Sequence, residues 1–321
     1  MTFVRTVLGD IEATQLGVTN AHEHLFIMGG LPVMKEPDFR LDSVEHAVTE
    51  VRSFLAAGGR SLLDAMPLDC GRSAARLMTV ARETGAHVIA CTGFHQRSFY
   101  DDLHWTHHYP VDQLTRLMIV EIEEGMDEHG CNGPIPARVE ARAGAIKIAT
   151  DYQRIAPVTE KLIEAAVAAH RATGAPIITH ADQGTMGLEQ AERLIRLGAN
   201  PSHVAIGHLD RNPDLAYHLA IAATGVFLQY DTPGRINYQP ESVVVALIAG
   251  MIEAGYGDRI LLGGDTARRS SWRSHGGGPG IAYIVERFLP RLRAEGFAPA
   301  AIDALVVANP ARAFSFAERV G

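Results

Sequence analysis

Short apolar segments alternate with amphipathic helical patterns along this whole chain. This alternation predicts repeated strand–helix units and a parallel sheet, because a crossover must return the chain before the next parallel strand can pair. Eight segments have the length and apolar content of buried strands, at residues 17–21, 61–65, 87–91, 144–149, 176–179, 204–207, 225–229 and 259–263. Helices are expected at residues 43–57, 71–84, 110–124, 159–173, 187–197, 213–223 and 242–254, from about 280 to 294, and after Pro299.

Eight strands separated by helices fit a closed (β/α)8 barrel, an α/β fold, in a single domain over residues 1–321. An open, doubly wound sheet is the alternative. That fold usually has a glycine-rich nucleotide loop after its first strand, whereas this chain has His22-Glu23-His24 there. We therefore expect the barrel.

One helix start has a local signature. In the segment Asn212-Pro213-Asp214, we expect Asn212 to be the N-cap, Pro213 the first helical residue and Asp214 an acidic residue in the first turn.

Composition excludes several classes of protein. The net charge of −8 disfavours nucleic acid or an anionic membrane as a partner, since both attract basic surfaces. The three cysteines are far apart and form no CxxC pair, which argues against a disulfide framework and a thiolate metal site. The first ten residues contain no apolar stretch of the signal-peptide kind, and no apolar run is long enough to span a bilayer. A cytoplasmic location is therefore the default expectation.

Side chains that can bind metal stand where several expected strands end, which is where barrel enzymes place their chemistry. His22 and His24 follow the first strand, and alternate residues of an extended segment point to the same side. The fifth, sixth and eighth strands end at His180, His208 and Asp265. One such histidine alone is more often a hydrogen-bonded core residue, but their recurrence at strand ends favours a metal centre. Imidazole and carboxylate ligands without thiolate suit Zn, Mn, Co, Ni or Fe(II).

The fourth expected strand carries Lys147 in an apolar setting. Alternation puts Lys147 on the same face as Ala145 and Ala149, and this face must point inward if Ile146 and Ile148 pack against helices. An unpaired ammonium group there would be costly. Either a neighbouring carboxylate pairs with Lys147, or carbon dioxide converts the amine into a carbamate, an anion whose two oxygens can bridge two metal ions.

The complete pattern of ligands resembles the phosphotriesterase family of the amidohydrolase superfamily, and the similarity covers nearly the whole chain. Further similar segments are residues 17–25, 177–187 (IITHADQGTMG), 206–210 and 309–314 (NPARAF). The resemblance implies a hydrolase with two divalent ions, zinc being the first expectation. It implies that one buried ion is bound by His22, His24 and Asp265, that a more exposed ion is bound by His180 and His208, and that carboxylated Lys147 and a hydroxide bridge them. The hydroxide would attack the substrate while Asp265 takes its proton.

The loops after strands three, seven and eight are expected to contact the substrate. The candidate substrate-binding residues are His95, Arg97, Arg235, Asn237, Arg268 and Ser271. Relatives that hydrolyse acyl-homoserine lactones often have an arginine after the aspartate of the seventh strand, but Thr232 follows Asp231 here. Residues 233–236, 263–268 and 276–280 look closer to relatives that hydrolyse phosphorylated sugar lactones.

A phosphate group would suit the arginines of these loops, which are Arg235, Arg268, Arg269 and Arg273. The glycine-rich residues 276–280 would add backbone N–H donors at the start of a helix. The alternative is that these arginines are solvated or pair with Asp231 and Glu241. Relatives that act on phosphorylated lactones hold the phosphate with a lysine and a tyrosine, and the matching positions here are Asn237 and Ser271. That difference favours a neutral or differently shaped lactone.

Three hypotheses follow. The chain is a lactonase for a small sugar or hydroxy-acid lactone, with or without phosphate. It is instead an organophosphate triesterase, a carboxylesterase or an acyl-homoserine lactone hydrolase. From another class, it is an inert barrel that binds a ligand. A homodimer is common among such relatives, although no motif in this chain tests it.

Overall fold

Eight parallel strands pair in chain order in the computed structural model, which describes residues 2–319. The strands are β3 (Thr19–Glu23), β4 (Ser61–Asp64), β5 (His87–Gly93), β6 (Ala145–Thr150), β7 (Ile177–Ala181), β8 (Val204–Ile206), β9 (Phe227–Tyr230) and β10 (Ile260–Leu262). The last strand returns to the first, because the amides of Gly264 and Asp265 donate to the carbonyl of His22 at 3.1 and 2.9 Å. The predicted (β/α)8 barrel is confirmed.

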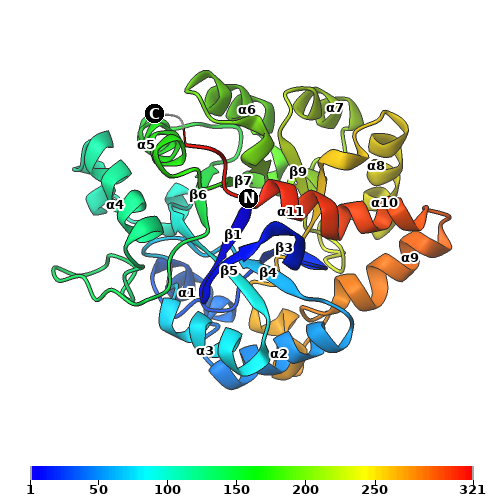
Figure 1. The fold of residues 1–321 in the computed structure, drawn as a ribbon, viewed down its shortest axis with the longest axis horizontal. Helices are drawn as coiled ribbons and strands as arrows, with labels where there is room; N and C mark the ends of the chain where they lie inside the picture. The colour runs from blue at the N-terminus through cyan, green and yellow to red at the C-terminus, as the bar shows by residue number, and fades with distance from the viewer. Residues whose placement is uncertain (1, 320–321) are drawn as a thin grey trace.

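Helices surround the strands (Figure 1). They are α1 (Leu31–Lys35), α2 (Val44–Ala56), α3 (Ala74–Thr84), α4 (Val111–Glu123), α5 (Pro157–Thr173), α6 (Gly187–Arg196), α7 (Leu215–Ala223), α8 (Glu241–Glu253), α9 (Leu289–Ala294), α10 (Pro299–Asp303) and α11 (Asn309–Ala313). Between residues 2 and 319, none of the helices combines the length and apolar content needed to cross a membrane.

Two local predictions were wrong. The N-cap of α7 is Asp214, whose side chain accepts from the amide of Tyr217 at 3.2 Å, so Asn212 and Pro213 precede the helix. The first barrel strand begins two residues later than expected and includes His22 and Glu23. The ladder with β4 explains this shift, since Glu23 still pairs with Asp64 after a β-bulge that shifts the register.

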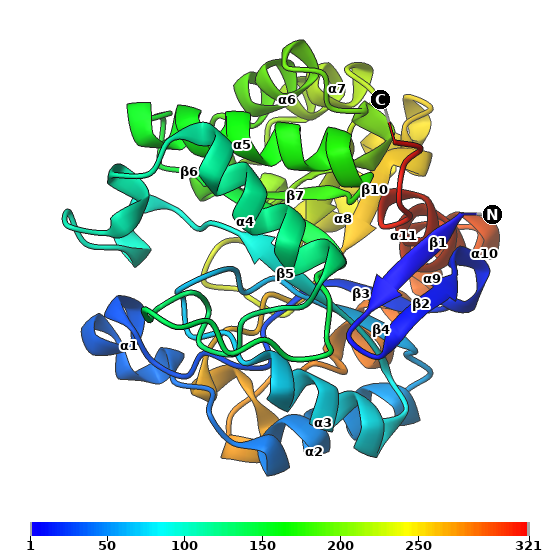
Figure 2. The same ribbon diagram turned by 60° about the vertical axis from the view of Figure 1, so that its left-hand side comes forward.

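An N-terminal hairpin was not predicted. Its strands β1 (Phe3–Thr6) and β2 (Gly9–Glu12) are antiparallel and lie beside the amino ends of the barrel strands (Figure 2). The Val7 amide donates to the carbonyl of Val88 at 2.8 Å, which joins the hairpin to β5. Four-residue strands without strong alternation give little local signal, so this hairpin depends on its contacts with the barrel.

Buried apolar residues form two layers. One cluster fills the inside of the barrel with residues from successive strands, namely Ala21, Leu63, Ile89, Ala145, Ile178, Ala205, Phe227 and Leu261. A second cluster contains Ile146 and Ile148 together with residues of the surrounding helices. Lys147 alternates with these isoleucines and therefore shares the inner face of β6 with Ala145.

The loop after β10 is attached to α2 through Glu50, which is only 2% exposed. The two carboxylate oxygens of Glu50 accept from the amides of Ser274 at 2.7 Å and Ile281 at 3.1 Å. This contact fixes the loop that carries Arg268 over the mouth of the barrel.

Replacing Glu50 with Ala is expected to lower the free energy of unfolding by about 1–3 kcal/mol, because two amides lose their acceptor. Urea denaturation measures the change. Arg52→Ala, an exposed change on the same helix, is the matched control and should stay within about 0.5 kcal/mol of the original protein. Equal stability of the two variants would contradict the attachment through Glu50.

Candidate metal centre

The carboxyl ends of the strands surround a cavity of about 190 Å³. Five of the six predicted metal ligands line it, namely His22, His24, His180, His208 and Asp265. Their side chains are nearly inaccessible to solvent. The barrel therefore brings together residues that lie up to 243 positions apart in the sequence, as expected from the common edge at which parallel strands end.

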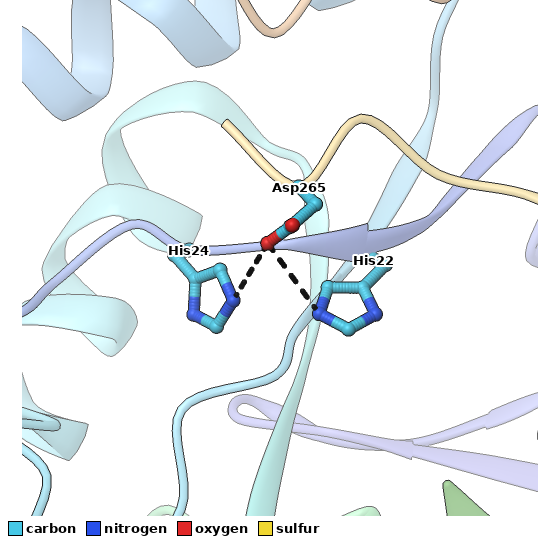
Figure 3. Close-up of side chains that lie close together, drawn as sticks. All are labelled: His22, His24 and Asp265. Atoms are coloured by element: carbon cyan, nitrogen blue, oxygen red, sulfur yellow. Dashed lines mark ion pairs between the residues drawn. The ribbon is translucent and has the colours of Figure 1, made fainter. Parts of the chain in front are cut away.

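The first group of candidate ligands consists of His22, His24 and Asp265 (Figure 3). The Oδ1 atom of Asp265 lies 3.3 Å from Nε2 of His24 and 3.8 Å from Nε2 of His22. Tetrahedral bonds of about 2.1 Å to one ion would separate such ligand atoms by about 3.4 Å. The three side chains therefore fit a divalent metal ion.

A second group surrounds His208. Its Nδ1 is 2.7 Å from Oδ1 of Asp231, so its Nε2 is left for another partner. A carboxylate that holds one ring nitrogen while the other faces a metal is a recurrent arrangement in metalloproteins. The ring of His180 lies against that of His208, with centroids 4.3 Å apart, and the ring of His95 lies 4.9 Å from that of His180.

Lys147 is completely buried, and within the described part of the chain its Nζ has no hydrogen-bond partner. Burial lowers the pKa of Lys147 to about 8. The positive charge of Lys147 in turn contributes to lowering the pKa values of His22 and His180. Gly93 lies directly beside it in the sheet with φ of +89°, where a Cβ atom would come 2.1 Å from the Lys147 carbonyl oxygen. A buried amine without a partner fits conversion to a carbamate, which needs the neutral amine as nucleophile.

The electrostatic environment suits metal ligands. Burial, reinforced by nearby positive groups, lowers the pKa values of His22, His180 and His208 well below the usual range. These imidazoles are therefore neutral at pH 7, the form that binds metal. Burial alone would raise the pKa of Asp265, but Arg235 and neighbouring histidines outweigh it and keep this pKa well below its ordinary value.

The structure divides the predicted substrate-binding residues into two sets. His95, Arg235 and Arg268 line the cavity, whereas Arg97, Asn237 and Ser271 do not. His95 stacks on Phe99 with ring centroids 3.6 Å apart. Arg97 is 40% exposed and lies 4.0 Å from Asp102.

Three of the four loop arginines lie close to carboxylates other than the expected Asp231 and Glu241. Arg268 lies 3.3 Å from Glu36, Arg269 lies 3.9 Å from Asp42, and Arg273 lies 2.7 Å from Glu286. The amides of the glycine-rich segment donate to carbonyls of the same loop, at residues 270 to 273, so they are not free donors. The expectation of an amide cradle at residues 276–280 was therefore wrong, because the loop folds back on itself.

Three residues of the site were missed from the sequence, namely Asp231, Arg211 and Tyr238. Asp231 directly follows β9, so the strand-end rule that selected the candidate ligands could have found it. Arg211 and Tyr238 lie in loops, and no local pattern marks them. Both line the cavity.

Replacing Asp231 with Asn is expected to weaken metal binding about 10- to 100-fold, as is typical when the partner of a metal-binding histidine is lost. The amide oxygen could still accept from His208, but without the negative charge that strengthens the bond. Competition with a chelating dye measures the affinity for Zn²⁺. An unchanged affinity would contradict the orienting role of Asp231.

Comparisons with known proteins agree with this geometry. Residues 2–314 match the model of the phosphotriesterase family. A phospho-furanose lactonase of Mycoplasmopsis synoviae is 37% identical over 99% of this chain and 93% of its own length. The crystal structure of an amidohydrolase from Mycoplasma synoviae superposes with a TM-score of 0.96 at 37% identity, covering 99% of this chain and 93% of that one. A lactonase structure from Listeria monocytogenes has a TM-score of 0.90 at 33% identity, with 98% and 100% coverage. The chain therefore belongs to the phosphotriesterase family.

Proposed function

We propose that this chain is a binuclear metal-dependent lactonase that opens a small sugar or hydroxy-acid lactone. The broader class, a hydrolase of ester bonds, follows from the family and from the relatives named above. The lactone itself, the metal ions and the carboxylated lysine belong to the proposal.

The observation that carries the substrate class is the small size of the cavity at the strand ends. Its volume of about 190 Å³ is below the range of about 300–1,000 Å³ that is common for sites of drug-sized ligands. A compact ring of a few carbon atoms suits this volume better than a lactone with a long acyl chain or a bulky aryl triester.

Charged groups line the cavity and favour a polar substrate. Arg211, Arg235 and Arg268 provide three cations against the carboxylates of Asp182 and Asp265. Arg268 is 36% exposed at the rim, so it is the cation that a phosphate substituent would meet first. The two positions that match the phosphate-binding lysine and tyrosine of relatives, Asn237 and Ser271, lie outside the lining.

Six side chains would hold the two divalent ions, namely His22, His24, Lys147 as its carbamate, His180, His208 and Asp265. When bound, such ions make water a nucleophile near neutral pH and polarise the carbonyl of an ester. Asp265 would accept the proton that the attacking water loses. Asp231 would keep His208 in the orientation in which Nε2 faces the centre.

A substrate panel tests this proposal. Purified protein is loaded with Zn²⁺ or, in parallel samples, with Mn²⁺ or Co²⁺. Each sample is assayed with five- and six-membered sugar lactones, with and without a phosphate group. An acyl-homoserine lactone, an aryl carboxylic ester and an aryl phosphotriester complete the panel. We expect the small lactones to have the highest kcat/KM, and chelation to remove the activity.

Other outcomes of the panel select other hypotheses. Faster hydrolysis of the phosphotriester or the aryl ester than of every lactone would overturn the lactonase proposal and favour the esterase alternatives. Absence of bound metal together with absence of activity would favour the inert barrel.

A further inference from the structure

Two arginines from different loops converge on one oxygen of Asp265. Arg211 follows β8 and donates to Oδ2 of Asp265 at 2.6 Å, and Arg235, in the loop after β9, donates to the same atom. Their side chains are only 6% and 13% exposed. The other oxygen, Oδ1, faces His22 and His24. The two oxygens of this carboxylate therefore have separate partners.

Tyr238 holds the two guanidinium groups together. The Cζ atoms of Arg211 and Arg235 lie 4.5 and 4.7 Å from the centroid of its ring, at distances typical of cation–π contacts. Arg235 also donates to the hydroxyl of Tyr238 at 3.2 Å. The aromatic ring thus offsets part of the repulsion between two cations that would otherwise separate.

The backbone and the side chain of Asp265 are held by different contacts. The residue follows two glycines and has φ of +46°, a left-handed conformation that is uncommon for a residue other than glycine. Its amide is fixed by the His22 carbonyl at 2.9 Å, but this bond leaves the carboxylate free to rotate. The two arginines remove that freedom because both bind Oδ2.

We propose that Arg211, Arg235 and Tyr238 form a clamp that positions Asp265 as a metal ligand, with Oδ2 bound to the arginines and Oδ1 directed to the metal shared with His22 and His24. This inference rests on the metal centre of the proposed function. It assigns the three residues a positioning role through Asp265 and does not require them to contact the substrate.

The direction in which the Zn²⁺ affinity changes when an arginine is removed distinguishes a positioning role from simple charge repulsion. A cation near a metal site repels the incoming ion, so removal of an arginine should strengthen metal binding if charge is its only effect. Removal should weaken metal binding if the arginine holds Asp265 in place, and the loss of an outer partner of a metal ligand typically costs 10- to 100-fold in affinity.

The experiment measures the affinity of metal-free protein for Zn²⁺ in the presence of bicarbonate, by competition with a chelating dye. The variants are Arg235→Met, Arg211→Met and Tyr238→Ala, with Arg268→Met as the matched control, because Arg268 lines the same cavity but pairs with Glu36 and Asp38. We expect about 10- to 100-fold weaker binding for each clamp variant and no weakening for the control. Arg235→Lys should recover part of the affinity, since an ammonium group can still donate to Oδ2.

Each outcome has a distinct meaning. Equal or tighter Zn²⁺ binding by both arginine variants overturns the clamp. Failure of the unmodified protein to bind Zn²⁺ overturns the metal centre itself, independently of the clamp. Circular dichroism and thermal melting identify any variant that does not fold, and Tyr238→Leu, which keeps an apolar side chain and loses the aromatic ring, then replaces Tyr238→Ala.

Discussion

Replacing Lys147 with Ala is expected to abolish both hydrolysis and stable metal binding. The variant loses the only group that could bridge two ions from the inner face of β6. Loss of even an indirect partner of a metal ligand reduces affinity about 10- to 100-fold, so loss of a bridging ligand should exceed this range. Metal analysis after dialysis, together with the kcat/KM for the best lactone of the panel, measures the effect.

The carbamate can be detected directly. The chain has three lysines, Lys35, Lys147 and Lys161, so a carbamate signal in 13C spectra of protein given labelled bicarbonate has few candidates. Burial lowers the pKa of Lys147 to about 8. Carbamate formation consumes the neutral amine, so in metal-free protein it should increase as the pH rises through about 8.

Two variants serve as controls for Lys147→Ala. Lys35→Ala removes an exposed lysine and should keep the carbamate signal, metal and activity. Lys147→Met fills the space of the buried side chain without an amine, so it separates loss of chemistry from loss of packing. Full activity of Lys147→Met in bicarbonate-free buffer would contradict the bridging role of Lys147.

Replacing Asp265 with Asn is expected to lower kcat/KM by at least about 100-fold, because the residue would lose its roles as anionic ligand and proton acceptor. The variant also leaves Arg211 and Arg235 without the anion that both contact. Uncompensated charge in a largely buried site is destabilising, so the melting temperature should fall as well. Steady-state kinetics and thermal melting measure the two effects.

Asp265→Glu distinguishes charge from geometry at the same position. It keeps the negative charge but lengthens the side chain by one methylene group, which changes the position of the carboxylate relative to His22 and His24. We expect it to preserve more stability than Asp265→Asn while remaining poorly active. Activity of Asp265→Asn equal to that of the unmodified protein would exclude this residue from the chemistry.

The sequence was sufficient to predict the barrel and the common location of the candidate metal-binding side chains. Alternation and helical periodicity are local properties, so they identified the eight strands, although boundaries such as that of β3 shifted by two residues. The carboxyl ends of parallel strands share one edge, so His180, His208 and Asp265 could be expected to meet without knowledge of the loops. The metal-binding roles assigned to these residues remain predictions.

Only the tertiary structure decided how the loops complete the site. Arg235 contacts Asp265, Arg268 pairs with Glu36, and the glycine-rich segment uses its own amides internally. The partner of an arginine depends on the path of loops that are distant in the sequence, and a guanidinium group on a long side chain can reach several carboxylates. The same reason explains why Arg211 and Tyr238 could not be found from the sequence. The role proposed for them depends on contacts between loops that are distant in the sequence, and no local pattern records these contacts.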